Sequence, residues 1–411
     1  MDEIRYEKQL PSLLSGQALI DAISYYPEYD RSIRDAEQYE RLEMLADIYK
    51  VFYPFPMVIE IYNKLHLATT LSLKKKNTKL AVQQRNETYK AIFGAGQYHG
   101  IIGGADSMTI IGTSGIGKSS AIQTSLGLIS DGKIIETANP YSKIIPCLQV
   151  QCPYDSSPKG LLLEILRNVD DIIGTRYNER SRKSSDTTDV LIGTVSQVAL
   201  NHIGLLVIDE IQNVWGRKNG TALMSMVIQL INSSGISICM VGTSECIPFF
   251  ESTVQLSRRS HGLKYDVLSY NEDFEAFCER LWKYQYCKEF SPIDVTIIDW
   301  LYQHSGGIIS NVVSLFHDSQ EIAILEGYEK VDLVMLEKAY RNRMGFMHRF
   351  IDGAEQIKHP AVGKKEDSFK EKDGELEEYQ TLEEMVAIGK KKGIDPLEYL
   401  MKRICVEEVA V

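Results

Sequence analysis

The stretch Gly112-Thr-Ser-Gly-Ile-Gly-Lys118-Ser119 decides the fold, because it fits the pattern GxxxxGK[ST] in full. The apolar run before it, Met108 to Ile111, predicts a strand, and Ser119 to Leu128 predicts the helix that follows. Glycines at these spacings let backbone N–H groups turn inward around phosphate oxygens, and the start of the helix adds partial positive charge. A loop of this pattern between a strand and a helix predicts a phosphate-binding loop.

Each position of this loop has an expected role in holding a nucleotide. Lys118 is expected to reach the β and γ phosphate oxygens, and the Ser119 hydroxyl to ligate magnesium. The expected cofactors are therefore ATP and Mg2+. The residues expected to contact them in and beside the loop are Gly112, Thr113, Ser114, Gly115, Ile116, Gly117, Lys118, Ser119 and Ser120.

A second motif, Leu205-Leu-Val-Ile-Asp209-Glu210, ends an apolar run with two acids. Asp209 is placed to hold magnesium through water, and Glu210 to orient or deprotonate the attacking water. The alternative is an ordinary buried strand that ends in two acids, but that pattern is much less common at this distance after a phosphate-binding loop. The two motifs together predict hydrolysis of ATP as well as its binding.

Two further segments offer residues for the same reaction. The apolar run that ends in Thr243 and Ser244 predicts a strand. The hydroxyl at its end, with Thr243 as the candidate, is expected to bond to the water or the γ phosphate. The alternative is that these residues cap the next helix. Arg258 and Arg259 are candidates for a guanidinium that reaches a neighbouring subunit's γ phosphate, and the alternative is a pair of surface arginines. The sequence does not show which of the two arginines would do so.

The order of the expected elements indicates an α/β fold. Four apolar, β-rich runs are separated by helical stretches long enough for crossover connections, which implies a parallel sheet with helices on its faces. Those runs are Met108–Ile111, Ile144–Val150, Leu205–Ile208 and Ile236–Val241. The expected domains are a helical N-terminal extension at 1–100, an α/β ATPase core at 101–272, a helical lid at 273–351 and a charged, flexible, partner-binding tail at 352–411.

Composition narrows the class of protein further. Hydrophobic residues make up 44% of the chain and charged residues 25%, as in ordinary soluble domains, and no apolar run approaches the ~20 residues of a membrane span. The first ten residues are acidic and polar, unlike a secretion signal. The seven cysteines include no CxxC pair, which argues against a zinc site or a disulfide framework. We expect a cytoplasmic protein with no membrane partner.

The charge distribution does not exclude a DNA-binding surface, but it provides no evidence for one. The net charge is -11, but the excess of acids lies near the two ends and the middle of the chain is about neutral. One polar stretch gathers candidate phosphate-contacting cations, although a solvated loop is the more ordinary interpretation of it. These cations are Arg176, Arg180, Arg182 and Lys183.

The chain resembles TnsC, the AAA+ regulator of target-selecting bacterial transposons. The resemblance rests on the phosphate-binding loop, on Ile203-Gly-Leu-Leu-Val-Ile-Asp-Glu-Ile-Gln-Asn213, on Val241-Gly-Thr-Ser-Glu245 and on Gln149-Val-Gln-Cys-Pro153, and it covers residues 40–350. It implies an AAA+ P-loop NTPase core with a parallel sheet, a helical N-terminal extension and a C-terminal helical lid, in the bacterial cytoplasm.

The resemblance also implies partners. Such a protein forms a homo-oligomer, a ring or filament, on double-stranded DNA while ATP is bound, links a target-selection protein to the transposase subunits, and disassembles on hydrolysis. The sequence contains nothing like a recognition helix, so we expect DNA binding without base specificity. By the same resemblance the tail from Asp352 to Val411 is a candidate for engaging the transposase; a disordered, solubilising end is the alternative.

One position departs from the pattern of many AAA+ lids. There, an arginine after Gly-Gly at the start of a helix contacts the γ phosphate, whereas here Ser305-Gly-Gly-Ile-Ile-Ser310 places Ser310 at that point. This substitution predicts weak nucleotide sensing by the lid, slow regulatory turnover and long-lived oligomers.

Two other classes share the ATP site. One is an initiator or helicase-loader AAA+ protein, which would normally carry a helix-turn-helix after the lid, and no convincing one is present. The other is a signalling or defence NTPase whose oligomer needs no DNA, and the acidic net charge is its best support.

Overall fold

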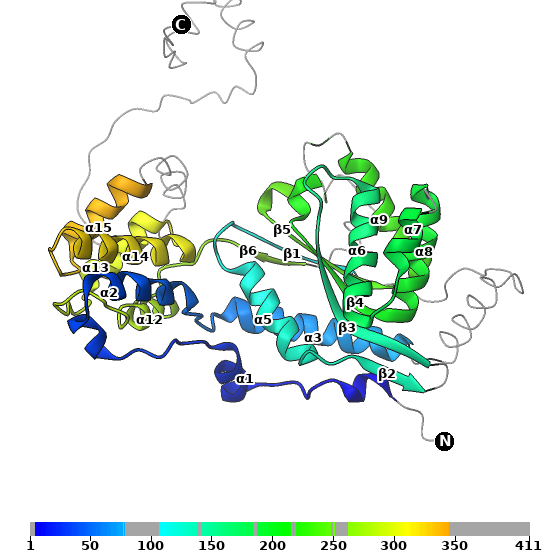
Figure 1. The fold of residues 1–411 in the computed structure, drawn as a ribbon, viewed down its shortest axis with the longest axis horizontal. Coiled ribbons are helices and arrows are strands. Elements are labelled where there is room, and N and C mark those ends of the chain that lie inside the picture. Colours follow the sequence, from blue (N-terminus) through cyan, green and yellow to red (C-terminus); the bar gives the residue numbers. More distant parts are fainter. Residues whose placement is uncertain are drawn as a thin grey trace, which may run out of the picture. The chain divides into compact units, whose positions relative to one another are not determined.

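The computed structural model of the protein describes residues 5–76, 78, 107–138, 141–183, 187–214, 217, 219–247, 250 and 262–344. Its centre is a six-stranded sheet in the order β2-β3-β4-β5-β1-β6 (Figure 1). All neighbouring strands are parallel except β2, which runs antiparallel to β3. The strands are β1 (Ser107–Gly112), β2 (Ile135–Ala138), β3 (Tyr141–Gln151), β4 (Ile203–Asp209), β5 (Ser237–Gly242) and β6 (Leu263–Tyr265).

The predicted α/β fold with a parallel sheet is confirmed. The four expected strands are present as β1, β3, β4 and β5, and three of them, β1, β4 and β5, are buried at every residue, as continuous apolar runs in a covered parallel sheet should be. β2 and β6 were not predicted. β6 is only three residues long and its middle residue, Lys264, is exposed, so it offers no apolar run to detect.

Helices cover both faces of the sheet and build the lid. The α-helices are α1 (Gly16–Ile23), α2 (Gln38–Met44), α3 (Pro56–Lys76), α5 (Lys118–Ser130), α6 (Pro158–Ile173), α7 (Tyr177–Lys183), α8 (Thr188–His202), α9 (Gly220–Ser234), α12 (Glu272–Leu281), α13 (Val295–Ser305), α14 (Ile309–Leu325) and α15 (Leu333–Ala339). Short 3₁₀ helices lie at η1 (Tyr6–Gln9), η2 (Arg31–Asp35), η3 (Leu45–Lys50), η4 (Ile211–Val214) and η5 (Ser244–Cys246), and a π turn at η6 (Tyr340–Met344).

The side chains of β4 alternate between the two faces of the sheet. Leu205 and Val207 pack in the cluster that contains α3 and α5, whereas Leu206 and Ile208 pack in the cluster that contains α6, α8 and α9. Figure 1 shows α3 and α5 on one face and α6, α8 and α9 on the other. This period of two is the geometry of a strand with both faces covered.

Helix α3 comes from the N-terminal region but is part of the layer that covers the sheet. The Ser72 hydroxyl donates a hydrogen bond to the Gly204 carbonyl oxygen at 2.6 Å, on β4. The buried Lys76 ammonium donates to the carbonyl oxygens of Ala199 at 3.0 Å and Leu200 at 2.6 Å, in the last turn of α8. A cation at a helix C-terminus satisfies carbonyls that have no partner within the helix.

The other N-terminal elements pack on the lid. Helix α2 is followed by the 3₁₀ helix η3, and both contact α14. Within the lid, side-chain caps set where helices begin: the Asp294 carboxylate accepts from the Ile297 backbone N–H at 2.9 Å, and Asp332 does the same for Val334 at 3.0 Å.

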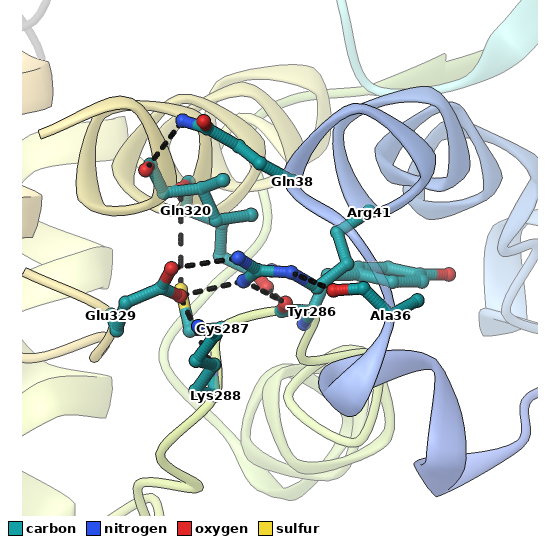
Figure 2. Close-up of polar contacts among 9 residues, drawn as sticks. Ala36, Gln38, Arg41, Tyr286, Cys287, Lys288, Gln320 and Glu329 are labelled. Carbon is teal, nitrogen blue, oxygen red and sulfur yellow. Dashed lines mark hydrogen bonds and ion pairs between the residues drawn. The ribbon is translucent and has the colours of Figure 1, made fainter. Parts of the chain in front are cut away.

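A buried ion pair joins the N-terminal segment to the lid (Figure 2). The Arg41 guanidinium donates to both carboxylate oxygens of Glu329, at 2.6 and 2.7 Å. It also donates to the carbonyl oxygens of Tyr286 at 3.0 Å and Ala36 at 3.2 Å. The Arg41 side chain is 2% exposed, so these four acceptors replace the water that a guanidinium would otherwise bind.

Candidate functional site

The phosphate-binding loop lies between β1 and α5, as expected, and its glycines are required by its geometry. Gly115 and Gly117 have φ of 81° and 91°, in the left-handed region that favours glycine. A Cβ on Gly112 would lie 2.6 Å from the Tyr265 carbonyl oxygen on β6. The loop therefore depends on backbone freedom at two positions and on close packing at a third.

Lys118 begins α5 and is turned back onto the loop. Its ammonium donates to the carbonyl oxygens of Gly112 at 2.8 Å and Thr113 at 2.7 Å, and the residue is 8% exposed. Burial lowers the pKa of Lys118, and the nearby Asp209 and Glu210 carboxylates oppose that shift. To bind a phosphate, the ammonium must exchange these carbonyls for phosphate oxygens.

The acidic pair lies at the end of β4, which is separated from β1 by β5. Asp209 is buried, and its carboxylate accepts from the Gln149 side-chain amide at 3.3 Å and from the Glu210 backbone N–H at 2.8 Å. Glu210 has φ of 59°, an uncommon backbone conformation for a residue with a side chain. Its carboxylate accepts a hydrogen bond from the Gln212 side chain.

Thr243 directly follows β5, the strand between β4 and β1. Its hydroxyl oxygen is buried and has no hydrogen-bond partner among the described residues, and it does not cap the 3₁₀ helix η5 that begins at Ser244. The capping alternative is therefore not realised. Leaving a buried hydroxyl without a hydrogen bond costs free energy. A hydrogen bond to a ligand group in the adjacent cavity would remove this cost.

These residues meet in one cavity of about 300 Å³ at the carboxyl ends of β1, β4 and β5. Its lining includes Asp209, Glu210, Thr243 and most of the predicted loop, but not Gly112, Thr113 or Ile116. It also includes Gln212, Gly242 and Ser310. The lining residues are Ser114, Gly115, Gly117, Lys118, Ser119, Ser120, Asp209, Glu210, Gln212, Gly242, Thr243 and Ser310. Ligands of open parallel sheets bind at this end of the strands.

The same cavity offers the ligands that magnesium prefers. Ser119 and Asp209 both line it and carry a hydroxyl and a carboxylate oxygen, and hard cations such as Mg2+ bind oxygen ligands. The Gln149 amide and the Glu210 backbone N–H each hold one Asp209 oxygen, which orients the carboxylate. The residues present therefore fit the expected ion.

The lid contributes to this cavity through the start of α14. The Ser310 backbone N–H donates to the Gly115 carbonyl oxygen at 3.0 Å, and a Cβ on Gly115 would lie 2.3 Å from the Ser310 hydroxyl oxygen. Ser310 thus touches the phosphate-binding loop itself. The sequence indicated its place in the lid, but only the fold brings the two segments into contact.

The other predicted site residues are outside this cavity. Arg176 directly precedes α7, and Arg180 and Arg182 lie on it; all three are exposed. The Asp170 carboxylate accepts from the backbone N–H groups of Tyr177 and Asn178, both at 2.8 Å, so this acid caps the start of α7. The side chain of Lys183, both Arg258 and Arg259, and the tail 352–411 are outside the described residues.

Gln212 was not predicted as a site residue. It forms part of the Asp-Glu-Ile-Gln-Asn run, but a glutamine after an acidic pair carries no distinct sequence signal. An exposed contact was also missed: the Arg217 guanidinium lies 4.2 Å from the centre of the Tyr154 ring, and that tyrosine is 72% exposed.

The fold and the site define an AAA+ P-loop NTPase, with an α/β core, a phosphate-binding loop, an acidic strand end and a helical lid that reaches the loop. Residues 102–267 match the model of a family described as "Bacterial TniB protein", a match that covers the core but less than half of the chain. This match confirms the resemblance to transposon-associated AAA+ ATPases that the motifs indicated.

Comparison with solved structures found distant likenesses. The Aeropyrum pernix ORC1 protein in complex with DNA is 13% identical with a TM-score of 0.42, over 80% of this chain and 78% of that one. Drosophila ORC bound to DNA is 10% identical with a TM-score of 0.44, over 97% and 84%. Domain III of the Thermotoga maritima replication initiation protein DnaA is 14% identical with a TM-score of 0.36, over 64% and 92%. No curated protein matches the sequence.

Within the described part of the chain, no helix combines the length and apolar character that a membrane crossing requires.

Proposed function

We propose that the protein is an ATP-dependent transposition regulator that oligomerises on double-stranded DNA without base specificity, links a target-selection protein to the transposase, and disassembles on ATP hydrolysis. The observation that carries the proposal is the single cavity that gathers Lys118, Asp209, Glu210 and Thr243 within a core matching the TniB family.

The proposed reaction uses residues on three adjacent strand ends. Lys118 gives up its bonds to the loop carbonyls and binds the β and γ phosphates, and Ser119 and Asp209 hold the magnesium ion. When bound there, magnesium would supply positive charge to offset the negative charge of the phosphate oxygens. Glu210 orients and deprotonates the attacking water, and the unpartnered Thr243 hydroxyl bonds to the water or the γ phosphate.

The lid is proposed to report nucleotide state weakly. Ser310 touches the phosphate-binding loop, but its short neutral side chain cannot supply the charge that an arginine would bring to a γ phosphate. Turnover is then slow and regulatory, and oligomers on DNA are long-lived. A single-turnover rate as high as that of a fast motor ATPase would overturn this point.

The remaining assignments rest on the sequence and the resemblance. Arg176, Arg180, Arg182 and Lys183 are proposed to contact DNA phosphates, and the first three are exposed as this requires. Arg258 or Arg259 is proposed to reach a neighbouring subunit's γ phosphate. The tail after residue 351 is proposed to engage the transposase.

Two measurements test the proposal together. The first is ATP hydrolysis by the wild type and by Glu210→Gln, which should bind ATP but lose at least about a hundredfold in kcat. The second is imaging of the protein with a slowly hydrolysed ATP analogue, with and without duplex DNA. Rings or filaments threaded by DNA support the proposal, whereas oligomers that ignore DNA favour a signalling NTPase and overturn it.

A further inference from the structure

One glutamine side chain joins the ends of two strands inside the ATP cavity. Gln212 lies in η4, is half-buried and lines the cavity. Its Nε2 donates to a Glu210 carboxylate oxygen, and its Oε1 accepts from the Thr243 backbone N–H at 3.2 Å. The same side chain therefore contacts the residue that follows β4 and the residue that follows β5.

The orientation of this amide is fixed by its partners. A backbone N–H can only donate, so the oxygen of the Gln212 amide must face Thr243. The nitrogen then faces the Glu210 carboxylate, which accepts. Exchanging the two amide atoms would place two donors together at Thr243 and two acceptors together at Glu210, so no other orientation satisfies both contacts.

The surrounding backbone is shaped to admit this side chain. A Cβ on Gly242 would lie 2.9 Å from the Gln212 Oε1 and 2.7 Å from an Ile211 methyl carbon, so only glycine leaves room at that position. Asn213 holds the same loop, because its side chain donates to the Cys152 carbonyl oxygen at 3.0 Å and its N–H donates to the Glu210 carbonyl oxygen at 3.0 Å. Gln212 is thus held on a fixed short loop.

Glu210 needs such a restraint. Its carboxylate lines an open cavity, and its backbone is in the left-handed region, where a residue with a side chain is normally less stable. A general base acts only when its oxygen is held within hydrogen-bond reach of the water that it deprotonates. Among the described residues, the Gln212 side-chain amide donates a hydrogen bond to this carboxylate.

We propose that Gln212 is a positioning residue that holds the Glu210 carboxylate beside Thr243 for hydrolysis and transmits to it any shift of Thr243. When the Thr243 hydroxyl takes up its missing partner, the backbone N–H of the same residue carries the change to Glu210 through the amide. This inference rests on the proposed ATPase activity and names a residue that acts through Glu210.

The test is the ATPase kinetics of Gln212→Met, which keeps the shape and removes both hydrogen bonds. The expected result is a fall in kcat of about tenfold to a hundredfold, the range for losing one hydrogen bond to a charged group, with KM and the affinity for an ATP analogue within about threefold of wild type. Gln229→Met, an exposed change on α9, is the matched control and should leave kcat unchanged.

Two more variants separate positioning from general damage. Gln212→Asn keeps the amide but is one methylene shorter, so it cannot span both partners and should also lower kcat. In a Glu210→Gln background, Gln212→Met should cause no further loss, because Gln212 acts through Glu210. A further loss there, a wild-type kcat in either single variant, or a changed ATP affinity with unchanged kcat would each overturn the inference.

These outcomes are distinct from failure of the proposed function. If the wild type hydrolyses no ATP, with or without DNA, the proposed function fails and this inference fails with it. If the wild type hydrolyses ATP, Glu210→Gln does not, and Gln212→Met matches the wild type, the inference alone is wrong.

Discussion

Replacing Arg41 with methionine should release the N-terminal segment from the lid. Arg41 donates four hydrogen bonds across this interface, two to the Glu329 carboxylate and one each to the carbonyl oxygens of Tyr286 and Ala36. The Arg41→Met variant keeps much of the apolar volume but leaves the carboxylate and both carbonyls without this donor (Figure 2). The pair is 2% and 18% exposed, so water replaces these bonds only in part.

The expected cost is about 3 kcal/mol of unfolding free energy. Removing one partner of a buried ion pair costs about 3 to 5 kcal/mol, and we take the lower end because Glu329 retains some contact with water. Arg341→Met is the matched control: Arg341 is exposed and pairs with Glu337 on the same helical stretch, so its loss should cost less than about 0.5 kcal/mol.

Hydrogen exchange measures this effect where it arises. Amides of α2 and η3 that are protected by docking on the lid should exchange about a hundredfold faster in Arg41→Met, since 1.4 kcal/mol corresponds to a factor of ten. Urea unfolding followed by circular dichroism gives the global value, and Arg341→Met sets the baseline for both assays. An Arg41→Met variant that matches this control in both assays would refute the reasoning.

The pH dependence of the same pair has a definite sign. Burial alone would raise the pKa of Glu329, but hydrogen bonds from Arg41 and the Lys288 backbone N–H outweigh it, so the pKa lies below its ordinary value. The pair therefore contributes stability above the unfolded pKa of about 4.3, and this contribution is lost as pH falls through the lower folded pKa. The stability difference between the wild type and Arg41→Met should shrink below about pH 4.

Two further predictions concern packing. Gly115→Ala should weaken ATP binding at least about tenfold, because φ is 81° there and the new Cβ would lie 2.3 Å from the Ser310 hydroxyl oxygen. The control is Gly127→Ala within α5, where the new Cβ meets no atom within 4 Å and binding should be preserved. Binding is measured with a fluorescent ATP analogue. Tyr286→Phe should leave the free energy of unfolding unchanged or raise it by about 1 kcal/mol, because its buried hydroxyl has no hydrogen-bond partner in the described part of the chain. Tyr284→Phe loses a 3.1 Å hydrogen bond to the Pro27 carbonyl oxygen and should lower the free energy of unfolding by about 1 kcal/mol. Urea unfolding that ranks the two variants the other way would contradict this.

Local sequence pattern was sufficient for the strands of the core and for the phosphate-binding loop. β4 and β5 are buried on both faces, so their residues are almost all apolar, and their ends are marked by a change to acids or hydroxyl residues. β6 could not be found in this way because pairing with β1, not apolar content, makes it a strand. Likewise, nothing in the sequence of α3 shows that it covers the sheet, because an apolar stripe on a helix does not show which surface the helix packs against.

The sequence by itself determined the chemistry that this protein can offer: a loop that fits phosphate, a pair of acids at a strand end and a hydroxyl after the next strand. Only the tertiary structure decided that these groups share one cavity, that Ser310 of the lid touches Gly115, and that Gln212 bridges Glu210 and Thr243. The physical reason is that residue types and spacings express local preferences, whereas contacts between distant segments depend on strand order and on which helix faces pack together.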